Sequence, residues 1–543
     1  MFQRANTHGI GQALALFALT ALAIAASWWW LGRPVALPPS PLADGEKLYC
    51  VSYAPYRGSQ DPLVEGTRIS AARIDEDLAL IAKYSNCVRI YSVEDNAAAV
   101  LEAARRHGLK VLDGLWLTSK PDKNRQQIAA TVAFAKQYHD VISAIIVGNE
   151  VLLRGEMTAD DLIAAIREVK AQVTEPVTYA DVWEFWLRYR EVASAVDFIT
   201  IHMLPYWEDF PIPADHAAAH VESIHNRVAT AFPGKEIMIG ELGWPSGGRM
   251  REAARPSPSN QARVILETLA FAKRDHIRVN VIEAFDQPWK RWLEGTVGAQ
   301  WGIFDRSTGA PKFSLTGGAI SDHPHWPLQA LAGIVLAAAA FGAALAAGRG
   351  KPQTPWFWWR IALLAFLPGV SLGWVVDQVG PESFSPGGWV RSVALAAIAA
   401  TSPIVCATAC AVRRPLPRLA ALLAGSDANR NGLFWAVGLS FLLLFFLAVQ
   451  AALGLVFDPR YRDIPFAAVG GAALPYLVLW ASAERRPGAP AFAERVAASV
   501  LAAAAVYIAF NETFANWQAV SFCAALLGLA FILAQARAAP SSE

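Results

Sequence analysis

The stretch Ile237-Met-Ile-Gly-Glu-Leu-Gly-Trp-Pro-Ser246 decides how the first half of this chain folds. Its apolar run ends in a carboxylate, Glu241, and a Gly-Trp-Pro turn follows at once. A short apolar run of this kind is typical of a buried parallel strand. The carboxyl end of such a strand is where a barrel enzyme carries its chemistry. A single Glu in this place is equally consistent with a cap or an ion pair, so a second signal is needed.

The second signal is Val141-Ile-Ser-Ala-Ile-Ile-Val-Gly-Asn-Glu150, which again places a carboxylate at the end of an apolar strand. Asn149 stands beside Glu150 and can donate hydrogen bonds to a ligand. Two carboxylates at two strand ends are the minimum set for glycoside hydrolysis, with one as acid/base and the other as nucleophile or base. Asp113 and Asp181 also follow predicted strands and are rival carboxylates, but neither has the flanking Asn or Gly-Trp-Pro context.

Strand and helix patterns alternate from about residue 45 to residue 322, which is typical of βα units. Eight strand candidates predict a closed (β/α)8 TIM barrel, with Glu150 ending the fourth strand and Glu241 the seventh. An open doubly wound sheet is the runner-up, but no glycine-rich phosphate loop follows the first strand. The predicted strands are 48–54, 87–91, 110–115, 141–147, 176–180, 197–202, 236–240 and 280–284, and the predicted helices include 74–84, 97–107, 124–138, 158–173, 214–231 and 260–274.

The strings Val147-Gly-Asn-Glu150 and Gly240-Glu-Leu-Gly-Trp-Pro-Ser246 resemble glycoside hydrolase family 17, the β-1,3-glucanases and related β-glucan transglycosylases. That family usually shows Glu-Thr-Gly-Trp-Pro-Ser, and Leu242 replaces the Thr here. The resemblance implies a retaining mechanism in which Glu150 is the acid/base, Glu241 is the nucleophile, and their carboxyl groups stand about 5 Å apart. We expect the negative charge of Glu241 to raise the pKa of Glu150, so that Glu150 is protonated at rest.

Aromatic and polar side chains at the predicted strand ends are candidate sugar contacts, because sugar rings present apolar C–H faces to flat aromatic walls. For any single ring, core packing is the favoured explanation, and the number of rings at strand ends is what points to sugar binding. Val88-Arg-Ile-Tyr91 resembles the family's second-strand segment, and 283–290 its eighth. His202-Met-Leu-Pro-Tyr206 occupies the place of its sixth-strand Asn-x-Tyr-Pro pattern. The predicted substrate-binding residues are Asn149, Tyr53, Tyr91, Trp116, His202, Tyr206, Trp244, Glu283, Asp286 and Lys290, and neither a metal nor a cofactor is expected.

The five cysteines show no metal-ligand spacing. Cys50 and Cys87 fall at the starts of the first two predicted strands. A disulfide between them is compatible with a location outside the cytoplasm, but two buried thiols are the favoured interpretation.

The whole chain is too apolar for an average soluble protein, since 54% of its residues are hydrophobic and 17% are charged, and the excess lies outside residues 45–322. The run 13–31 ends in tryptophans, which favours a membrane anchor over a cleaved signal peptide. We therefore expect an anchor (or signal) with a Pro-rich spacer at 1–44, the barrel at 45–322, and an all-α polytopic membrane domain at 323–543. Its seven apolar segments, each near the length that spans a bilayer, are 327–347, 361–379, 393–412, 433–456, 464–483, 496–510 and 517–533, of which the sixth is short.

Basic residues alternate between the loops that join these segments, and the positive-inside rule turns that alternation into a topology. We expect an integral protein of a bacterial-type inner membrane, with the barrel periplasmic or extracellular and the C-terminus cytoplasmic. The basic loops carry Arg349, Lys351 and Arg360; then Arg413, Arg414, Arg418 and Arg430; then Arg485, Arg486 and Arg495.

The sequence thus predicts a membrane-anchored retaining enzyme that hydrolyses or transfers β-1,3-glucan at the cell envelope, with formation of β-1,6 links left open. Its expected partners are a β-glucan, the lipid bilayer and, as an open question, a glucan synthase. The net charge of +1 gives no sign of nucleic-acid binding. The alternative is a non-hydrolytic membrane component of β-glucan synthesis or export, whose barrel binds or remodels the emerging chain. A complete synthase is not expected, because no nucleotide-sugar motif is visible.

Overall fold

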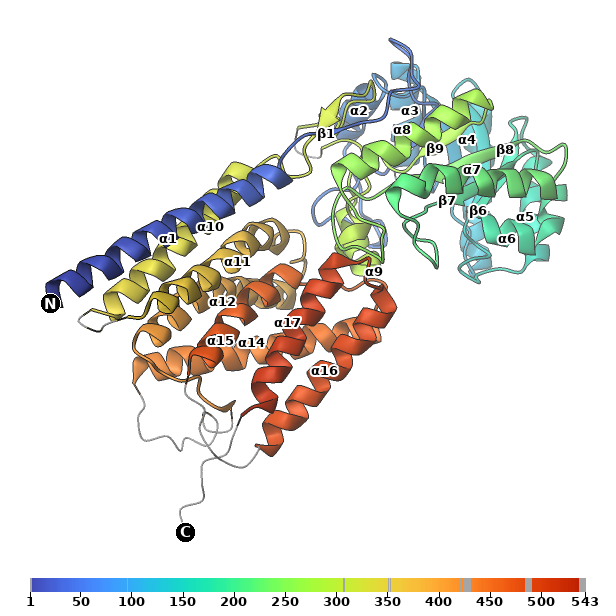
Figure 1. The fold of residues 1–543 in the computed structure, drawn as a ribbon. Coiled ribbons are helices and arrows are strands. Elements are labelled where there is room, and N and C mark those ends of the chain that lie inside the picture. The colour runs from blue at the N-terminus through green and yellow to red at the C-terminus, as the bar shows by residue number, and fades with distance from the viewer. Residues whose placement is uncertain are drawn as a thin grey trace. The chain divides into compact units, whose positions relative to one another are not determined.

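The computed structural model describes residues 2–94, 96–305, 308–349, 351, 353–419, 422, 431–483 and 491–536. The chain divides into two compact units. The barrel unit comprises Val35–Gly248 and Ala253–Ile320, and the helical unit comprises Met1–Pro34, Arg249–Glu252 and Ser321–Glu543. Figure 1 shows strands and surrounding helices in the first unit and long helices in the second.

The barrel is closed by eight parallel strands that follow one another in chain order, which confirms the predicted TIM barrel. Two further short strands, β1 (Val35–Ala36) and β10 (Ala319–Ile320), pair antiparallel where the chain enters and leaves this unit. The barrel strands are β2 (Cys50–Ser52), β3 (Cys87–Arg89), β4 (Lys110–Leu115), β5 (Ile142–Asn149), β6 (Val177–Val182), β7 (Ile199–Met203), β8 (Ile237–Leu242) and β9 (Val279–Val281).

Some of the helices around the barrel begin where the sequence supplies a side-chain cap. Thr158 accepts a hydrogen bond from Asp161 N before α5, and Ser257 accepts one from Asn260 N before α8. Between β6 and β7, where no helix is predicted, the structure has the short helix α6 and a 3₁₀ turn. The helices are α2 (Ala71–Ile81), α3 (Ala97–His107), α4 (Pro121–Gln137), α5 (Ala159–Lys170), α6 (Trp183–Arg188), η1 (Arg190–Ser194), α7 (Ala214–Ala231), α8 (Pro258–Arg274), η2 (Pro288–Lys290) and α9 (Arg291–Gly298).

Glycine follows Glu241 and Leu242 because the chain passes close to the next strand there. A Cβ atom on Gly243 would lie 2.3 Å from the carbonyl oxygen of Ile282, a separation that real side chains do not adopt. The Gly-Trp-Pro turn that follows β8 therefore depends on this close approach.

Cys50 and Cys87 form a disulfide, so the interpretation of two buried thiols is wrong. The parallel register pairs Val51 with Val88, which brings the first residues of β2 and β3 side by side. Their Cα atoms are 4.3 Å apart, and the bond links the two strands at their amino ends.

The helical unit contains every apolar segment predicted from the sequence as a helix. Seven of its described helices are long and apolar enough to cross a membrane. The short one is the fifth C-terminal segment, α15 with 17 residues, and not the sixth, because α16 extends to 21 residues. Its helices are α1 (Phe2–Leu31), α10 (Trp326–Ala347), α11 (Pro355–Val379), α12 (Pro386–Ala411), α14 (Gly432–Phe457), α15 (Phe466–Ser482), α16 (Phe492–Glu512) and α17 (Trp517–Ala534). Arg430, Arg485, Arg486 and the C-terminal residues 537–543 of the topology prediction lie outside the described residues.

The first helix packs with the others in this unit. Ile24 and Trp28 of α1 are fully buried there. A Cβ atom on Gly373 of α11 would lie 2.1 Å from the Trp28 ring, so the glycine makes room for it. Small residues at helix contacts are how apolar helices approach closely when the surrounding solvent is lipid.

The helical unit also includes a four-residue segment, Arg249–Glu252. The Arg249 guanidinium forms an ion pair with Glu512 and donates to the Pro459 carbonyl at 2.6 Å. Asn516 Nδ2 donates to the Met250 carbonyl at 3.1 Å. The charged pair is buried and fully hydrogen-bonded, which is the condition under which a buried ion pair is tolerated.

Candidate functional site

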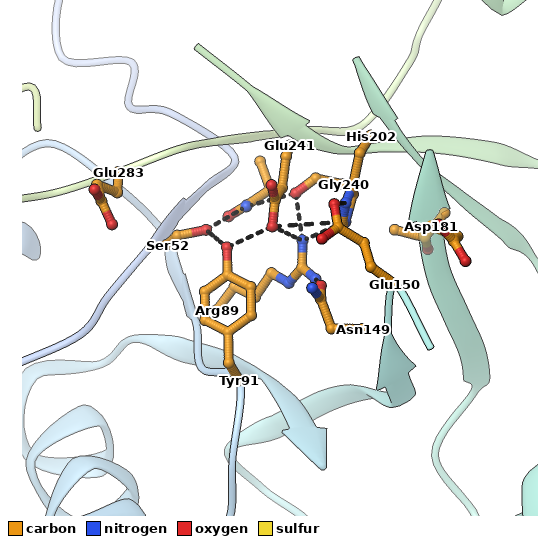
Figure 2. A network of polar contacts seen from close by, with 12 residues as sticks. Ser52, Arg89, Tyr91, Asn149, Glu150, Asp181, His202, Gly240, Glu241 and Glu283 are labelled. Carbon is orange, nitrogen blue, oxygen red and sulfur yellow. Dashed lines mark hydrogen bonds and ion pairs between the residues drawn. The ribbon is translucent and has the colours of Figure 1, made fainter. Parts of the chain in front are cut away.

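Glu241 lies near the carboxyl end of β8 and is 5% exposed. The Tyr91 hydroxyl donates to Glu241 Oε1 at 2.8 Å, and Arg89 Nη1 lies 3.5 Å from the same oxygen. Burial and the charge of Glu241 raise the pKa of Tyr91 well above its ordinary value, so the hydroxyl keeps its proton and donates it. Figure 2 shows Tyr91 and Arg89 converging on this carboxylate.

A chain of hydrogen bonds supports Tyr91 from behind. Asn280 Nδ2 donates to Ser52 Oγ at 2.8 Å, and Ser52 Oγ lies 2.8 Å from the Tyr91 hydroxyl. Because Tyr91 donates to Glu241, the serine must donate to Tyr91. Such a chain polarises each bond in the same direction and fixes the position of the oxygen of Tyr91. The sequence reasoning missed Ser52 and Asn280; the signal was a polar residue at an inward position of an apolar strand.

Arg89 is the centre of the network and was also missed. It is 1% exposed, donating from Nη1 to the Gly240 carbonyl at 2.7 Å and from Nη2 to Asn149 Oδ1 at 2.6 Å. One guanidinium therefore joins β3 to β5 and β8. The available signal was its place in Val88-Arg-Ile, since a charged residue within an apolar strand is stable only with partners inside the barrel.

His202 of β7 stands between the two carboxylates (Figure 2). Its Nδ1 lies 2.9 Å from Glu150 Oε1, while its Nε2 lies 3.2 Å from Arg89 Nη1 and 3.6 Å from Glu241 Oε1. An arginine only donates, so Nε2 accepts from Arg89 and the ring proton resides on Nδ1. His202 then donates that proton to Glu150.

The carboxylates of Glu150 and Glu241 are close together. One oxygen of each, with a ring nitrogen of His202, lies in a group whose atoms are all within 4.8 Å of one another. This separation matches the roughly 5 Å of retaining glycosidases and is shorter than inverting enzymes need. The same three atoms are close enough to hold a metal ion, but Arg89 already faces Glu241 and His202, and its charge opposes a cation there.

The pKa of Glu150 departs from the prediction. Burial raises the pKa, but the hydrogen bond from His202, followed by the charges of Arg154 and Arg89, outweighs burial, and the pKa lies below its ordinary value. The expectation that Glu241 raises this pKa is wrong, because His202 and Arg89 lie beside both carboxylates. A carboxyl with a lowered pKa is ionised at neutral pH, so Glu150 carries a negative charge there.

A second pair of charged side chains, Lys290 and Glu283, lies near Glu241. Lys290 Nζ is 3.3 Å from Glu283 Oε2, and both side chains are largely buried. Burial raises the pKa of Glu283 to about 7, against the opposing charge of Lys290. The sequence reasoning missed Glu294 of α9. Burial raises the pKa of Glu294, and so do the negative charges of Glu150 and Glu241, so this carboxyl lies near those two carboxylates. Figure 2 shows Glu283 apart from the hydrogen-bonded network.

Four of the predicted sugar contacts are engaged with other groups of the protein. Tyr53 is 2% exposed and its hydroxyl donates to Asp77 at 3.0 Å. Tyr206 and Trp244 are fully buried in one aromatic cluster, with ring centroids 5.8 Å apart. Asp286 accepts from Lys312 Nζ at 2.8 Å and from the Gly302 amide at 2.9 Å, so it holds a loop together.

Trp116, like Tyr91, is a predicted aromatic contact that is only half-buried. It follows β4, with the Arg154 guanidinium 4.2 Å above its ring. Asn149 is buried, and its side-chain oxygen is occupied by Arg89. Tyr91, Asn149, Glu150, His202 and Glu241 thus meet in one network, while Glu283 and Lys290 form a neighbouring pair.

The rival carboxylates do not join the network. Asp113 lies within β4 and not at its end, is fully buried, and has no hydrogen-bond partner among the described residues. Asp181 accepts from the Tyr179 hydroxyl and from the Val182 amide, and Figure 2 shows it outside the dashed contacts.

We expect Asp113→Asn to stabilise the folded barrel. Burial raises the pKa of Asp113 to about 7, against about 3.9 for an unfolded Asp. The unfolded state therefore loses its proton first as pH rises, so wild-type stability falls between about pH 4 and pH 7, by about 4 kcal/mol in all. The neutral amide has no such cost. Thermal unfolding at pH 4.5 and pH 8 checks this: the gain should be small at the lower pH and large at the higher, and an equal gain at both would contradict it.

The barrel and its paired carboxylates define a class of protein, the glycoside hydrolases. Residues 50–302 match the family model of the BtgE/BtgC glycoside hydrolase domain. This match supports the predicted family 17 resemblance of the barrel, and the chain is an enzyme of the glycosidase or transglycosylase class.

The chain is similar to curated proteins over the same half. A glucan 1,3-beta-glucosidase of Saccharomyces cerevisiae is 26% identical over 278 residues, which cover 46% of this chain and 87% of that protein. A probable beta-glucosidase btgE of Aspergillus fumigatus is 27% identical, covering 47% of this chain and 45% of that protein. Among solved structures, a Rhizomucor miehei beta-1,3-glucanosyltransferase of glycoside hydrolase family 17 has a TM-score of 0.45 and 25% identity, covering 50% of this chain and 98% of that one.

Proposed function

We propose that this chain is a membrane-anchored retaining enzyme that hydrolyses or transfers β-1,3-linked glucan. The observation that carries the proposal is the separation of the Glu150 and Glu241 oxygens, which lie within 4.8 Å. The substrate class comes from relatives named glucan 1,3-beta-glucosidase, which share 26% to 28% identity with this chain.

In the first step Glu241 attacks the anomeric carbon while Glu150 protonates the departing glycosidic oxygen. The carboxylate oxygen held by Tyr91 and Arg89 stays fixed, which leaves the other oxygen of Glu241 for the attack. Glu150 must take up a proton as substrate binds. Substrate displaces water from a carboxyl that is already partly buried, and this desolvation favours the neutral form.

In the second step Glu150 acts as base toward a water or a sugar hydroxyl, which displaces Glu241 from the glycosyl-enzyme. Water gives hydrolysis, and a sugar hydroxyl gives transfer. A 6-hydroxyl as acceptor would form the β-1,6 link. Around the reacting carbon, Lys290, Glu283 and Asn149 would bind sugar hydroxyls, and the open face of Trp116 would pack against a ring.

We also propose the division of the chain into an anchor and spacer (1–44), a catalytic barrel (45–322) and a membrane domain (323–543). Seven apolar helices of sufficient length, counted over the part of the chain that the structure describes, support membrane spanning. Burial of Ile24 and Trp28 among the other helices supports an uncleaved anchor. The Cys50–Cys87 disulfide supports a barrel outside the cytoplasm, where such bonds persist. A glucan synthase would be the partner if the substrate is a newly made chain.

Reporter fusions test the proposed topology. A phosphatase fused after Ser321 should be active and one fused after Glu543 silent, because the basic loops hold their side of the membrane in the cytoplasm. A fluorescent protein that matures only in the cytoplasm should give the reverse pattern. An inactive Ser321 phosphatase fusion at good expression would place the barrel in the cytoplasm and exclude an envelope glucan as substrate.

Product analysis on a defined β-1,3-glucan oligosaccharide tests the function itself. Shorter products indicate hydrolysis, longer or branched products indicate transfer, and no new product indicates the alternative, a non-hydrolytic component of glucan synthesis or export. Substitutions in the less basic loops of the membrane domain, which the proposed topology puts outside the cytoplasm, should leave these products unchanged if the barrel carries the chemistry.

A further inference from the structure

Arg154 follows Glu150 by four residues, and all three nitrogens of its guanidinium are engaged. Nη2 donates to the Leu117 carbonyl at 2.9 Å, Nη1 to the Asn149 carbonyl, and Nε to Glu156 Oε1 at 3.1 Å. The backbone N–H of Arg154 donates to the Glu150 carbonyl at 2.9 Å. The side chain therefore joins the end of β5 to the loop that follows β4.

The backbone at Asn149 needs this support. The residues on either side, Gly148 and Glu150, both have positive φ, 88° and 51°. Glycine adopts this conformation freely, but a glutamate pays for it with a close contact of its Cβ atom. Arg89 holds the side chain of Asn149 at 2.6 Å, and Arg154 holds its carbonyl. Two cations on one residue fix the direction in which the next side chain, Glu150, leaves the strand.

Arg154 also contacts Trp116, one of the aromatic residues predicted to bind sugar. Its Cζ lies 4.2 Å over the ring of Trp116, and the backbone N–H of Trp116 donates to Gln127 Oε1 at 3.0 Å. One face of Trp116 is thus covered by a guanidinium, and a sugar would pack against the other. If the Trp116 ring moved, the Arg154 guanidinium would move with it and would displace the Asn149 carbonyl to which it donates.

We propose that Arg154 is a positioning residue for Glu150, and that it links sugar contact at Trp116 to the orientation of this acid/base. The inference rests on the proposed function. Lysine cannot replace arginine in this role. An ammonium lacks the planar fork that reaches two carbonyls, and it does not stack flat on an aromatic ring as a guanidinium does.

A role through charge alone predicts a different result. Burial raises and His202 lowers the pKa of Glu150, and the charge of Arg154 lowers it further. Loss of that charge alone would leave more Glu150 protonated and would help the acid step. Loss of the fork would displace Glu150 and slow the same step. Arg154→Lys keeps the charge and loses the fork, while Arg154→Met loses both.

The experiment uses the full chain in detergent and two substrates, a β-1,3-glucan oligosaccharide and an aryl β-glucoside with a leaving group of low pKa. Both variants should lose about 100-fold in kcat/KM on the oligosaccharide, the cost of misplacing a reacting group by about 1 Å. The aryl glucoside needs little acid help and should lose far less.

The matched control is Arg105→Met. Arg105 also donates to a carbonyl, that of Gln137 at 3.0 Å, pairs with Asp140, and lies 4.7 Å over the ring of Tyr138. It lies on α3, away from the network of Glu150, so its loss should leave the ratio of the two substrates unchanged.

Four outcomes would overturn the inference. Wild-type rates in Arg154→Lys would show that the charge suffices. Equal loss on both substrates, at unchanged melting temperature, would show a general structural role. Active wild-type protein with unaffected variants would overturn this inference alone, whereas wild-type protein that cleaves neither substrate would overturn the proposed function and the inference with it.

Discussion

Glu241→Gln is expected to abolish glycosyl-enzyme formation, with turnover falling by about 10⁴-fold or more while the fold stays intact. The amide has nearly the same volume, but its oxygen carries no charge to attack the anomeric carbon. It also weakens two contacts made by the carboxylate, the 2.8 Å hydrogen bond from Tyr91 and the 3.5 Å ion pair with Arg89. Turnover of the oligosaccharide and mass spectrometry of trapped glycosyl-enzyme measure the effect.

Glu102→Gln is the matched control for this variant. Glu102 on α3 likewise accepts a hydrogen bond from a tyrosine hydroxyl, that of Tyr138 at 2.8 Å, but lies outside the network. It should leave turnover unchanged. Wild-type-like turnover in purified, folded Glu241→Gln protein would sink the assignment of the nucleophile.

The strands and most helices of the barrel were predictable because each follows from a local pattern. The strand 110–115 and the helices 97–107 and 214–231 match the structure at both ends. Continuous apolar runs and helical periodicity depend only on neighbours in sequence. The apolar segments of the C-terminal half were predictable for the same reason, although the length of the sixth, α16, was underestimated.

The site was predictable only in part, because barrel closure brings distant residues together. Glu150 and Glu241 stand out in the sequence, since each ends an apolar strand in a motif. Arg89 gains its role only when β3 comes within reach of Gly240 and Asn149. The pKa of Glu150 likewise depends on His202, which lies 52 residues further along the chain. No local pattern contains either fact.

Burial was the other quantity that local patterns did not supply. Tyr206 and Trp244 follow strands, as sugar-binding rings do, yet they pack against each other and against Trp301. Trp116 has the same kind of position but is only half-buried. Whether a ring is buried depends on the way in which the long loops fold back over the barrel. Tertiary packing decides the path of those loops.

Glu150→Ala should slow cleavage of glucan oligosaccharides by about 10³-fold, because the departing sugar then leaves without a proton. An aryl glucoside with a good leaving group should lose much less in the first step, since its phenolate departs unassisted. For that substrate the second step becomes limiting, because the base that activates water is also gone. The comparison of kcat/KM on the two substrates separates the steps.

Added azide should then restore turnover of the aryl glucoside by Glu150→Ala, because this anion attacks the glycosyl-enzyme without a base and fits the space that the side chain leaves. The retained product, a β-glycosyl azide, would show that Glu241 still forms the intermediate. The hydrogen bond from His202 Nδ1 at 2.9 Å to Glu150 Oε1 is also lost in this variant, which leaves a donor facing the same space for an anion. Equal loss on both substrates, with no azide product, would show that Glu150 is not the acid/base and that the short separation of the two carboxylates has another cause.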